Sequence, residues 1–255
     1  MQKSLFLVLF VAFISGHCTM IVFEKPIPSQ ATIIDKCPAE LLGQFVEDNK
    51  DTLPHLLQEV LSFESPKPNQ WLIYGYEQFS SDDLKNFPAY TLKNNVLTQH
   101  IKVELKENES SKDSIVETPF IRTKTGYQTT KHLAFGLDFT TKTITEYPDN
   151  KENEVKTGTF EMRKKGDTFY LNTSGLITPP DKYWFVVLFT PKDERLTINM
   201  LSQMNKEKEA VFNAIMPMTK IDDDAYLAKP TDEQLEAFIK HPEVGEVTVY
   251  KRIKQ

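Results

Sequence analysis

Alternating apolar and polar side chains recur along much of the chain, a pattern typical of strands that bury one face. Aromatic and β-branched residues are frequent in these segments, and both types pack well on a pleated surface. Residues 53–63 fit a helix or a strand equally well, because their apolar run follows neither period. The strands that the pattern predicts are residues 39–48, 69–79, 97–105, 132–139, 138–147 and 245–253.

Two further segments predict complete hairpins, with two arms and a turn. In residues 157–173, apolar positions fall at strand spacing on both sides of a turn at 164–167. Residues 183–201 turn at 191–194, and their first arm is apolar on both faces, so it should lie inside the sheet system. Short strands joined in order by tight turns predict an antiparallel meander.

Two helices are expected near the C-terminus, over residues 205–217 and 230–242. The second begins at Thr231, a good N-cap, and Gln234 completes a capping box. Each has an apolar side that should be buried. The apolar positions are Val211, Phe212 and Ile215 in the first helix, and Leu235, Phe238 and Ile239 in the second. The chain is therefore expected to be mainly β, an antiparallel meander or β-barrel with one or two packed helices near the C-terminus.

The N-terminus has the pattern of a secretory signal. Lys3 precedes ten residues without a polar side chain, residues 5–14, and small or polar residues follow. The apolar run is too short for a membrane-spanning helix, which needs about 20 residues. Signal peptidase requires small residues at the first and third positions before its cut. A cut after residue 15 or 16 breaks that rule, whereas a cut after Cys18 satisfies it.

The run Ser15-Gly16-His17-Cys18 resembles the lipobox of bacterial lipoproteins, which are cleaved before the cysteine and carry lipid on it. The run departs from that family at His17, where a small residue is usual. The resemblance implies a signal peptide over residues 1–17 and a lipid on Cys18. It also implies a protein exported to the bacterial cell envelope and anchored there in a membrane.

The residues that follow Cys18 predict a spacer. Pro26 and Pro28 disfavour a helix, so residues 18–38 are expected to be a lipidated N-terminus and an extended tether. Residues 39–255 would form a single barrel-like domain. The alternative is a soluble secreted protein, which begins at Thr19 or joins Cys18 to Cys37, the only other cysteine, in a disulfide.

Charge and glycine content exclude several classes of partner and cofactor. The 255 residues include 30 Lys and Arg against 36 Asp and Glu, a net charge of −6. Removing residues 1–17 deletes only Lys3, which leaves 29 against 36, or −7. Such a chain is not expected to bind nucleic acid. Nine glycines include no phosphate-binding motif, and the five histidines have no metal-ligand spacing, so neither cofactor nor metal is expected.

The layout resembles the lipocalin-like exported lipoproteins of Bacteroidetes-type bacteria. The shared features are a signal, a cysteine, a proline-containing segment, a meander, a helix and a last strand. Gly43-Gln44-Phe45 lies where such barrels often carry Gly-x-Trp, with Phe45 in place of the tryptophan. The resemblance implies a β-barrel that either fills its interior with side chains or holds one small ligand. It implies no chemistry.

No catalytic motif is present, so the expected function is the binding of a small apolar ligand or of an envelope partner protein. Aromatic residues are the candidate ligand-binding side chains, because they can line an apolar cavity. The alternative is an exported hydrolase whose site is scattered along the sequence. Asn108 and Asn172 begin N-glycosylation sequons, which matter only in a eukaryotic secretory pathway. The candidate ligand-binding residues are Trp71, Tyr74, Tyr76, Tyr183 and Trp184.

Overall fold

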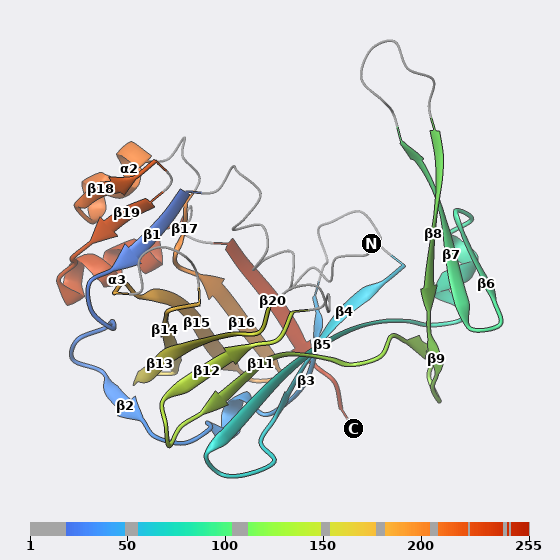
Figure 1. Ribbon diagram of the computed structural model, residues 1–255, viewed down its shortest axis with the longest axis horizontal. Coiled ribbons are helices and arrows are strands. Elements are labelled where there is room, and N and C mark those ends of the chain that lie inside the picture. The colour runs from blue at the N-terminus through green and yellow to red at the C-terminus, as the bar shows by residue number, and fades with distance from the viewer. Residues whose placement is uncertain are drawn as a thin grey trace.

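Ten antiparallel strands form a closed barrel, which confirms the expected mainly β fold (Figure 1). The computed structural model describes residues 19–48, 56–103, 112–148, 154–176, 182–204, 209–223, 225–241, 244 and 246–254. The barrel strands are β3 (Gly43–Glu47), β4 (Gln58–Glu64), β5 (Gln70–Phe79), β11 (His132–Asp138), β12 (Thr143–Glu146), β13 (Lys156–Lys165), β14 (Thr168–Ser174), β15 (Phe185–Lys192), β16 (Arg195–Met200) and β20 (Glu246–Arg252).

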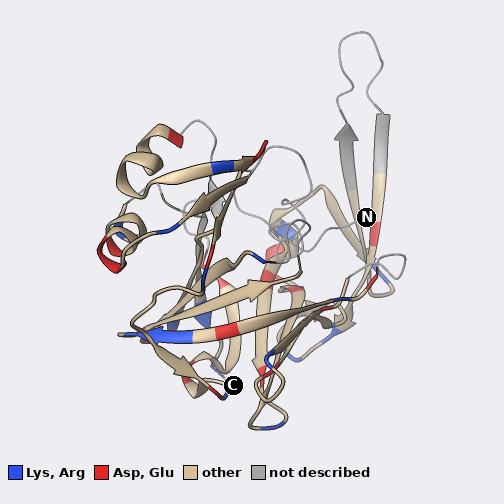
Figure 2. Cartoon of the chain, turned by 60° about the vertical axis from the view of Figure 1, so that its left-hand side comes forward, with Lys and Arg blue, Asp and Glu red and all other residues tan. Residues whose placement is uncertain are grey.

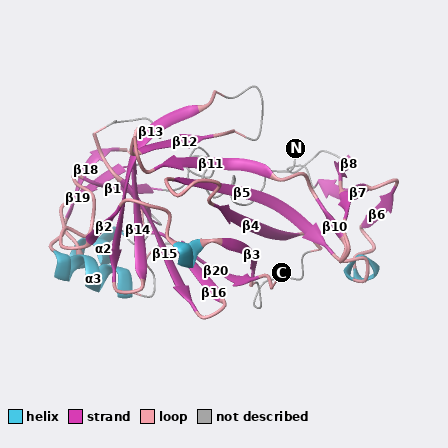
Figure 3. Ribbon diagram, turned by 90° about the horizontal axis from the view of Figure 1, so that it is seen from below, coloured by secondary structure: helices cyan, strands magenta, loops and turns pink. Residues whose placement is uncertain are grey.

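The barrel is a meander interrupted by two insertions. Neighbours in sequence pair in order from β3 to β5 and from β11 to β16, and the pairings β5–β11, β16–β20 and β20–β3 complete the circle. One insertion, between β5 and β11, contains β6 to β10. The other, between β16 and β20, contains β17, β18, β19 and two helices. Figure 3 shows the helices on one side of the barrel and the β6–β8 sheet on the other.

The predicted hairpins and helices are confirmed. The turn between β13 and β14 has Gly166 at φ +61°, and residues 53–63, left undecided by their periodicity, contain all of β4 except its last residue. The helices are α2 (Glu209–Ile215) and α3 (Asp232–Lys240), and α3 has the expected capping box between Thr231 and Gln234. The apolar side of α2 is only partly buried, because Phe212 is fully buried while Val211 is 41% exposed.

Aromatic side chains fill the lower half of the barrel, the half that holds the β13–β14 and β15–β16 turns. Trp71 stacks on Phe63 with 5.5 Å between ring centres, and Phe189 meets both rings edge-on at 5.6 and 6.1 Å. Phe45 adds a further edge contact to Phe63 at 5.6 Å. All four are at most 2% exposed. The lower half is therefore a packed core, as in small barrels generally.

A short 3₁₀ helix, η1 (Ala39–Leu41), closes the lower end. Leu41 is fully buried in the interior cluster. Arg252 donates hydrogen bonds to two backbone carbonyls at the end of η1, and its guanidinium lies 4.5 Å from the centre of the Phe45 ring. Gly43 has φ +130°, and a Cβ there would come within 2.6 Å of Arg252 Nη1. The Gly43-x-Phe45 pattern is thus explained by the packing of Arg252.

The expected tether over residues 18–38 is corrected by the structure. Residues 19–23 form β1 (Thr19–Phe23), which pairs with β17 (Gln203–Met204) on one side and β19 (Ala225–Ala228) on the other. β18 (Met218–Asp222) completes this small sheet. Ile21, Val22 and Phe23 are at most 1% exposed. Apolar residues ahead of the prolines therefore join a buried sheet, which stabilises them more than solvent exposure would.

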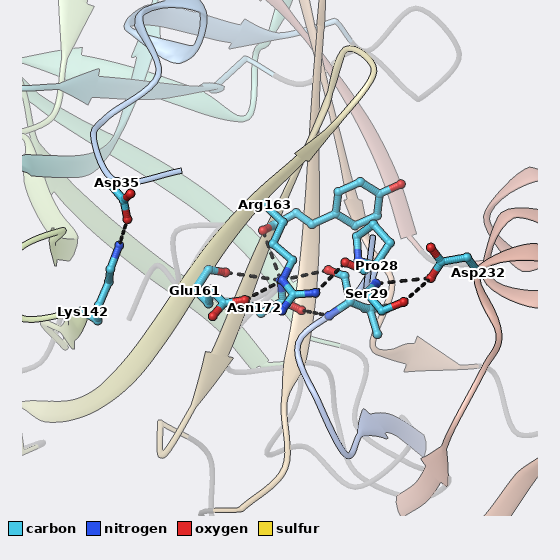
Figure 4. A network of polar contacts seen from close by, with 10 residues as sticks. Pro28, Ser29, Asp35, Lys142, Glu161, Arg163, Asn172 and Asp232 are labelled. Carbon is cyan, nitrogen blue, oxygen red and sulfur yellow. Dashed lines mark hydrogen bonds and ion pairs between the residues drawn. The ribbon is translucent and has the colours of Figure 1, made fainter. Parts of the chain in front are cut away.

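The rest of the expected tether is fastened to the barrel as a strap, residues 24–34 (Figure 4). The buried Asn172 side chain accepts from Ile27 N–H at 2.8 Å and donates to Ile27 O at 3.0 Å. Arg163 donates to the Pro28 carbonyl, and the Ser29 hydroxyl and N–H donate to Asp232. The strap ends in β2 (Thr32–Ile34), which pairs with β13. Residues 19–34 are consequently part of the folded body.

The small sheet and helices cover one outer face of the barrel. Their apolar side chains share a cluster with outward-facing residues of β14 and β15, among them Tyr170, Val186 and Leu188. On the other side, β6 (Tyr90–Lys93), β7 (Val96–Val103) and β8 (Lys112–Pro119) form a sheet that stands away from the barrel (Figure 1). β9 (Ile121–Arg122) and β10 (Tyr127–Gln128) join it to β5.

Candidate functional site

The upper half of the barrel interior differs from the lower half in its chemistry. Phe63 and Trp71 belong to the interior, and every second residue along a strand points the same way. Glu59 is four residues before Phe63, and Glu77 is six residues after Trp71, so both carboxylates face inward. They are directly opposite each other in the β4–β5 ladder, so their side chains are close neighbours.

Further acidic residues occupy inward positions of the same half. Glu47 lies opposite Tyr250, whose fully buried side chain is part of the interior cluster. Glu146 is two residues after the interior Ile144 on β12. Figure 2 marks acidic positions in red on several barrel strands. Four glutamates from four strands therefore line the upper interior.

A tyrosine joins the two halves of the interior. The Tyr250 hydroxyl donates to Glu59 Oε1 at 3.3 Å, and the two residues are 0% and 5% exposed. Like charges placed directly opposite in a ladder repel each other, so the Glu59–Glu77 pair favours a cation or hydrogen-bond donors between them. The upper interior is thus suited to a ligand that donates hydrogen bonds or carries positive charge.

The Glu146 carboxylate lies in surroundings that disfavour its charged form. Burial raises the pKa of the Glu146 carboxyl above its ordinary value, and the opposing Lys156 only partly offsets that shift. A carboxylate that is retained although its environment disfavours the charged form is more often found at functional sites than elsewhere. Glu146 is therefore a candidate binding residue within this group.

We predict that Glu146→Gln makes the protein more stable at pH 7. Because the folded state has the higher pKa, it binds more protons than the unfolded chain, and stability falls as pH rises from about 4.3 through the folded pKa. Glutamine removes this loss, and the gain should vanish below about pH 4. Urea unfolding at both pH values measures it.

Glu236→Gln is the matched control for this prediction. The Lys165 ammonium lowers the pKa of the exposed Glu236 carboxyl, so this substitution should destabilise the protein at pH 7, with the opposite sign. A Glu146→Gln protein that is less stable than the wild type at pH 7 would contradict the burial argument.

Trp71, one of the predicted ligand-binding residues, lies in the packed lower core with no exposed surface. Its indole Nε1 is buried without a hydrogen-bond partner among the described residues. Tyr74 and Tyr76 are on the same strand, but they lie on its outer face, since they alternate with the inward positions. The Lys131 ammonium is 5.6 Å from the centre of the Tyr76 ring.

The remaining predicted residues are on the far side of the barrel. Tyr183 and Trp184 precede β15, which is five strands from β5 in either direction around the ten-stranded barrel. Trp184 exchanges two backbone hydrogen bonds with Phe23, and its side chain packs against the cluster beneath the small sheet. The five aromatic residues therefore do not form one site. Cys18, the predicted lipid attachment point, lies outside the described residues.

Other predicted chemistry can be located. Burial raises the pKa of the Cys37 thiol to about 12, so this thiol is a poor nucleophile at neutral pH. Asn172, which begins one sequon, is fully buried and holds the strap, so it cannot carry a glycan in the folded protein. In the part of the chain that is described, no group of three or more His, Cys, Asp and Glu residues could hold a metal ion.

Two surface pockets lie outside the barrel interior. One, of about 280 Å³, lies between the start of the strap and the start of α3, and the ion pair of Glu24 with Lys229 forms part of its wall. The other, of about 290 Å³, is at the lower end, where Lys164 pairs with Glu40. The charged groups of these two pairs already neutralise each other.

Sequence reasoning missed the four glutamates, although one signal was available. Glu59, Leu61 and Phe63 share a face once residues 53–63 are recognised as a strand, which places an acid on an apolar face.

Comparison with known proteins does not identify a relative, since no family model, curated protein or solved structure matches the chain. No helix among the described residues has the length and apolar character needed to cross a membrane.

Proposed function

We propose that this protein is exported and lipid-anchored in the bacterial cell envelope, and that it binds a small molecule at the upper end of its barrel without catalysing a reaction. The observation that carries the binding role is the contrast between the two halves of the interior. Aromatic side chains fill the lower half, whereas inward glutamates line the upper half. Barrels of this kind commonly hold one small ligand at their open end.

The chemistry of the upper half refines the expected ligand. An apolar molecule would gain little beside Glu59, Glu77 and Glu146, because it would remove water from acidic side chains without adding a hydrogen bond to them. A molecule with amino, guanidino or several hydroxyl groups gives them donors, and charge-assisted hydrogen bonds of this type are stronger than neutral ones. The proposed ligand is therefore a small polar compound that carries donors or positive charge.

The position of β1 is compatible with the anchoring role. β1 starts at Thr19, directly after Cys18, and its side chains are core residues. Cleavage before Cys18 leaves this strand intact and places a single residue ahead of it. Any cut beyond residue 19 would remove part of a buried strand. The lipobox-like run and the start of the fold are thus compatible with each other.

One experiment tests both parts of the proposal. The protein is purified from its native host, and its mass is measured under denaturing and under native conditions. The denatured chain should begin at Cys18 and carry the mass of a lipid, while the Cys18→Ser variant should be soluble or unprocessed. The native spectrum should contain an additional small molecule, and Glu59→Gln and Glu77→Gln together should remove it.

Two results would overturn the proposal. A mature chain that begins at Thr19, or one that joins Cys18 to Cys37 without lipid, would show a soluble secreted protein. A native mass for the wild type that equals the mass of the lipidated chain alone would show that the upper interior retains no ligand. The two readouts are independent, so either role can fail while the other stands.

A further inference from the structure

The chain is held tightly from its first described residue. Thr19 is 1% exposed, and Ile21 and Phe23 are fully buried. The Ile21 N–H donates to the Ser202 carbonyl, and Phe23 and Trp184 exchange two backbone hydrogen bonds, all at 2.9 Å. Because β1 pairs with strands on both sides, it is a central strand and not a detachable edge.

The strap after β1 is also fixed to the barrel. Asn172 and Arg163 hold Ile27 and Pro28, and β2 then joins the barrel. If the 18 residues from 19 to 36 were a flexible spacer, they would give a root-mean-square reach of roughly 21–25 Å. Because residues 19–34 are part of the folded body, the only link between Cys18 and β1 is one peptide unit, which spans about 3.8 Å.

We infer that the protein sits directly on the bilayer, with the end of the small sheet where β1 begins facing the lipid. This inference rests on the lipid that the proposed function assigns to Cys18. Acyl chains on Cys18 are buried in the membrane, and one peptide bond links them to a strand of the core. The folded body is therefore held against the lipid surface in a restricted orientation.

The register of the small sheet identifies the residues nearest the membrane. Met20 pairs with Ala225, and Ala225 pairs with Asp222 on the next strand. Neighbouring strands are about 4.8 Å apart, so the Asp222 Cα lies roughly 10 Å from that of Met20. Ile221, 37% exposed, is an apolar side chain at the same end.

The charges on the described residues at this end of the sheet do not favour anionic lipid. Asp222 and Asp223 are exposed, and the nearby Lys220 already pairs with Asp223. We expect the acyl chains to supply the binding, at about 0.8 kcal/mol for each buried methylene. Membrane retention should accordingly be insensitive to salt, since screening weakens only interactions between charges.

The turn between β15 and β16 is at the other end of these two strands from the residues that bond to β1. Trp184, which bonds to Phe23, precedes β15, and Asp193 lies nine residues further along at the turn. At about 3.4 Å per residue this separation is roughly 30 Å. Asp193 is exposed and should point away from the bilayer.

The test compares energy transfer from these two positions to the membrane. In a Cys37→Ala background, Asp223→Cys and Asp193→Cys are each labelled with a fluorescent donor on the lipidated protein. The proteins are reconstituted into phosphatidylcholine vesicles that contain a little rhodamine-labelled lipid. Transfer from position 223 should exceed that from position 193 at least about twofold, because about 30 Å of strand separates Asp193 from Trp184, which bonds to β1.

A Gly/Ser insertion between Cys18 and Thr19 is the matched control. About 20 inserted residues restore a flexible reach, so the difference between the two positions should largely disappear. Equal transfer without the insertion, or stronger transfer from position 193, would overturn the inferred orientation while the protein stays on the vesicles. Protein that fails to sediment with the vesicles would overturn the lipid anchor and this inference together.

Discussion

Phe238→Asp is expected to lower the free energy of unfolding by at least about 4 kcal/mol. Phe238 is fully buried in α3, and its ring meets that of Phe212 edge-on, with 5.4 Å between ring centres. Truncating such a ring costs about 3–5 kcal/mol, and the carboxylate would in addition be placed among apolar side chains. Urea denaturation followed by circular dichroism measures the change.

Ala237→Asp is the matched control, because it places the same residue in the same helix one position away, at an exposed site. Its cost should stay below about 1 kcal/mol, which is the difference in helix propensity between Ala and Asp. The difference between the two variants isolates burial from propensity. Equal costs for both would mean that α3 does not pack on the barrel through Phe238.

Much of the barrel could be predicted because its strands follow one another in space as in sequence. Phe160 and Leu171 have strand spacing around a Gly166 turn, so the β13–β14 hairpin is visible within residues 156–174. Closure depends on the pairing of Tyr250 with Glu47, which are about 200 residues apart. No local pattern signals such a pairing, and only the number and order of the strands indicate it.

The role of residues 19–34 could not be predicted from local patterns. Pro26 and Pro28 correctly indicate an extended backbone, but they do not say what that backbone packs against. The partners of β1 are Met204 and Ala225, which are distant in sequence and lie in the second insertion. A short apolar segment after a signal-like run resembles a spacer until these non-local partners are known.

The candidate site shows why residue type alone misleads. Trp71 and Tyr74 are three residues apart on one strand, yet one lies in the core and the other on the outer face. An aromatic side chain therefore indicates bulk, and its position on the strand decides whether it can meet a ligand. The inward acids are informative because charge is rare on a buried face.

Asn172→Ala is expected to cost about 3 kcal/mol or more and to loosen the strap. The Asn172 side chain is fully buried and satisfies both backbone groups of Ile27, and it also donates to the carbonyls of Glu161 and Tyr170. Alanine leaves the Ile27 N–H buried without its acceptor, and each such group costs about 1–3 kcal/mol. Unfolding in urea measures the loss, and hydrogen exchange at the Ile27 amide reports the strap directly.

Asn69→Ala separates the effect of burial from that of losing an asparagine. Asn69 makes one side-chain hydrogen bond, to Thr140 at 2.7 Å, at an exposed site where water can replace the partner. Its loss should cost under about 1 kcal/mol and leave exchange at Ile27 unchanged. If Asn172→Ala is as mild as Asn69→Ala, and the Ile27 amide stays protected, then the pairing of β2 with β13 alone holds the strap. In that case the Asn172 side chain would only fill space in the core, and its hydrogen bonds would not be what holds the strap against the barrel.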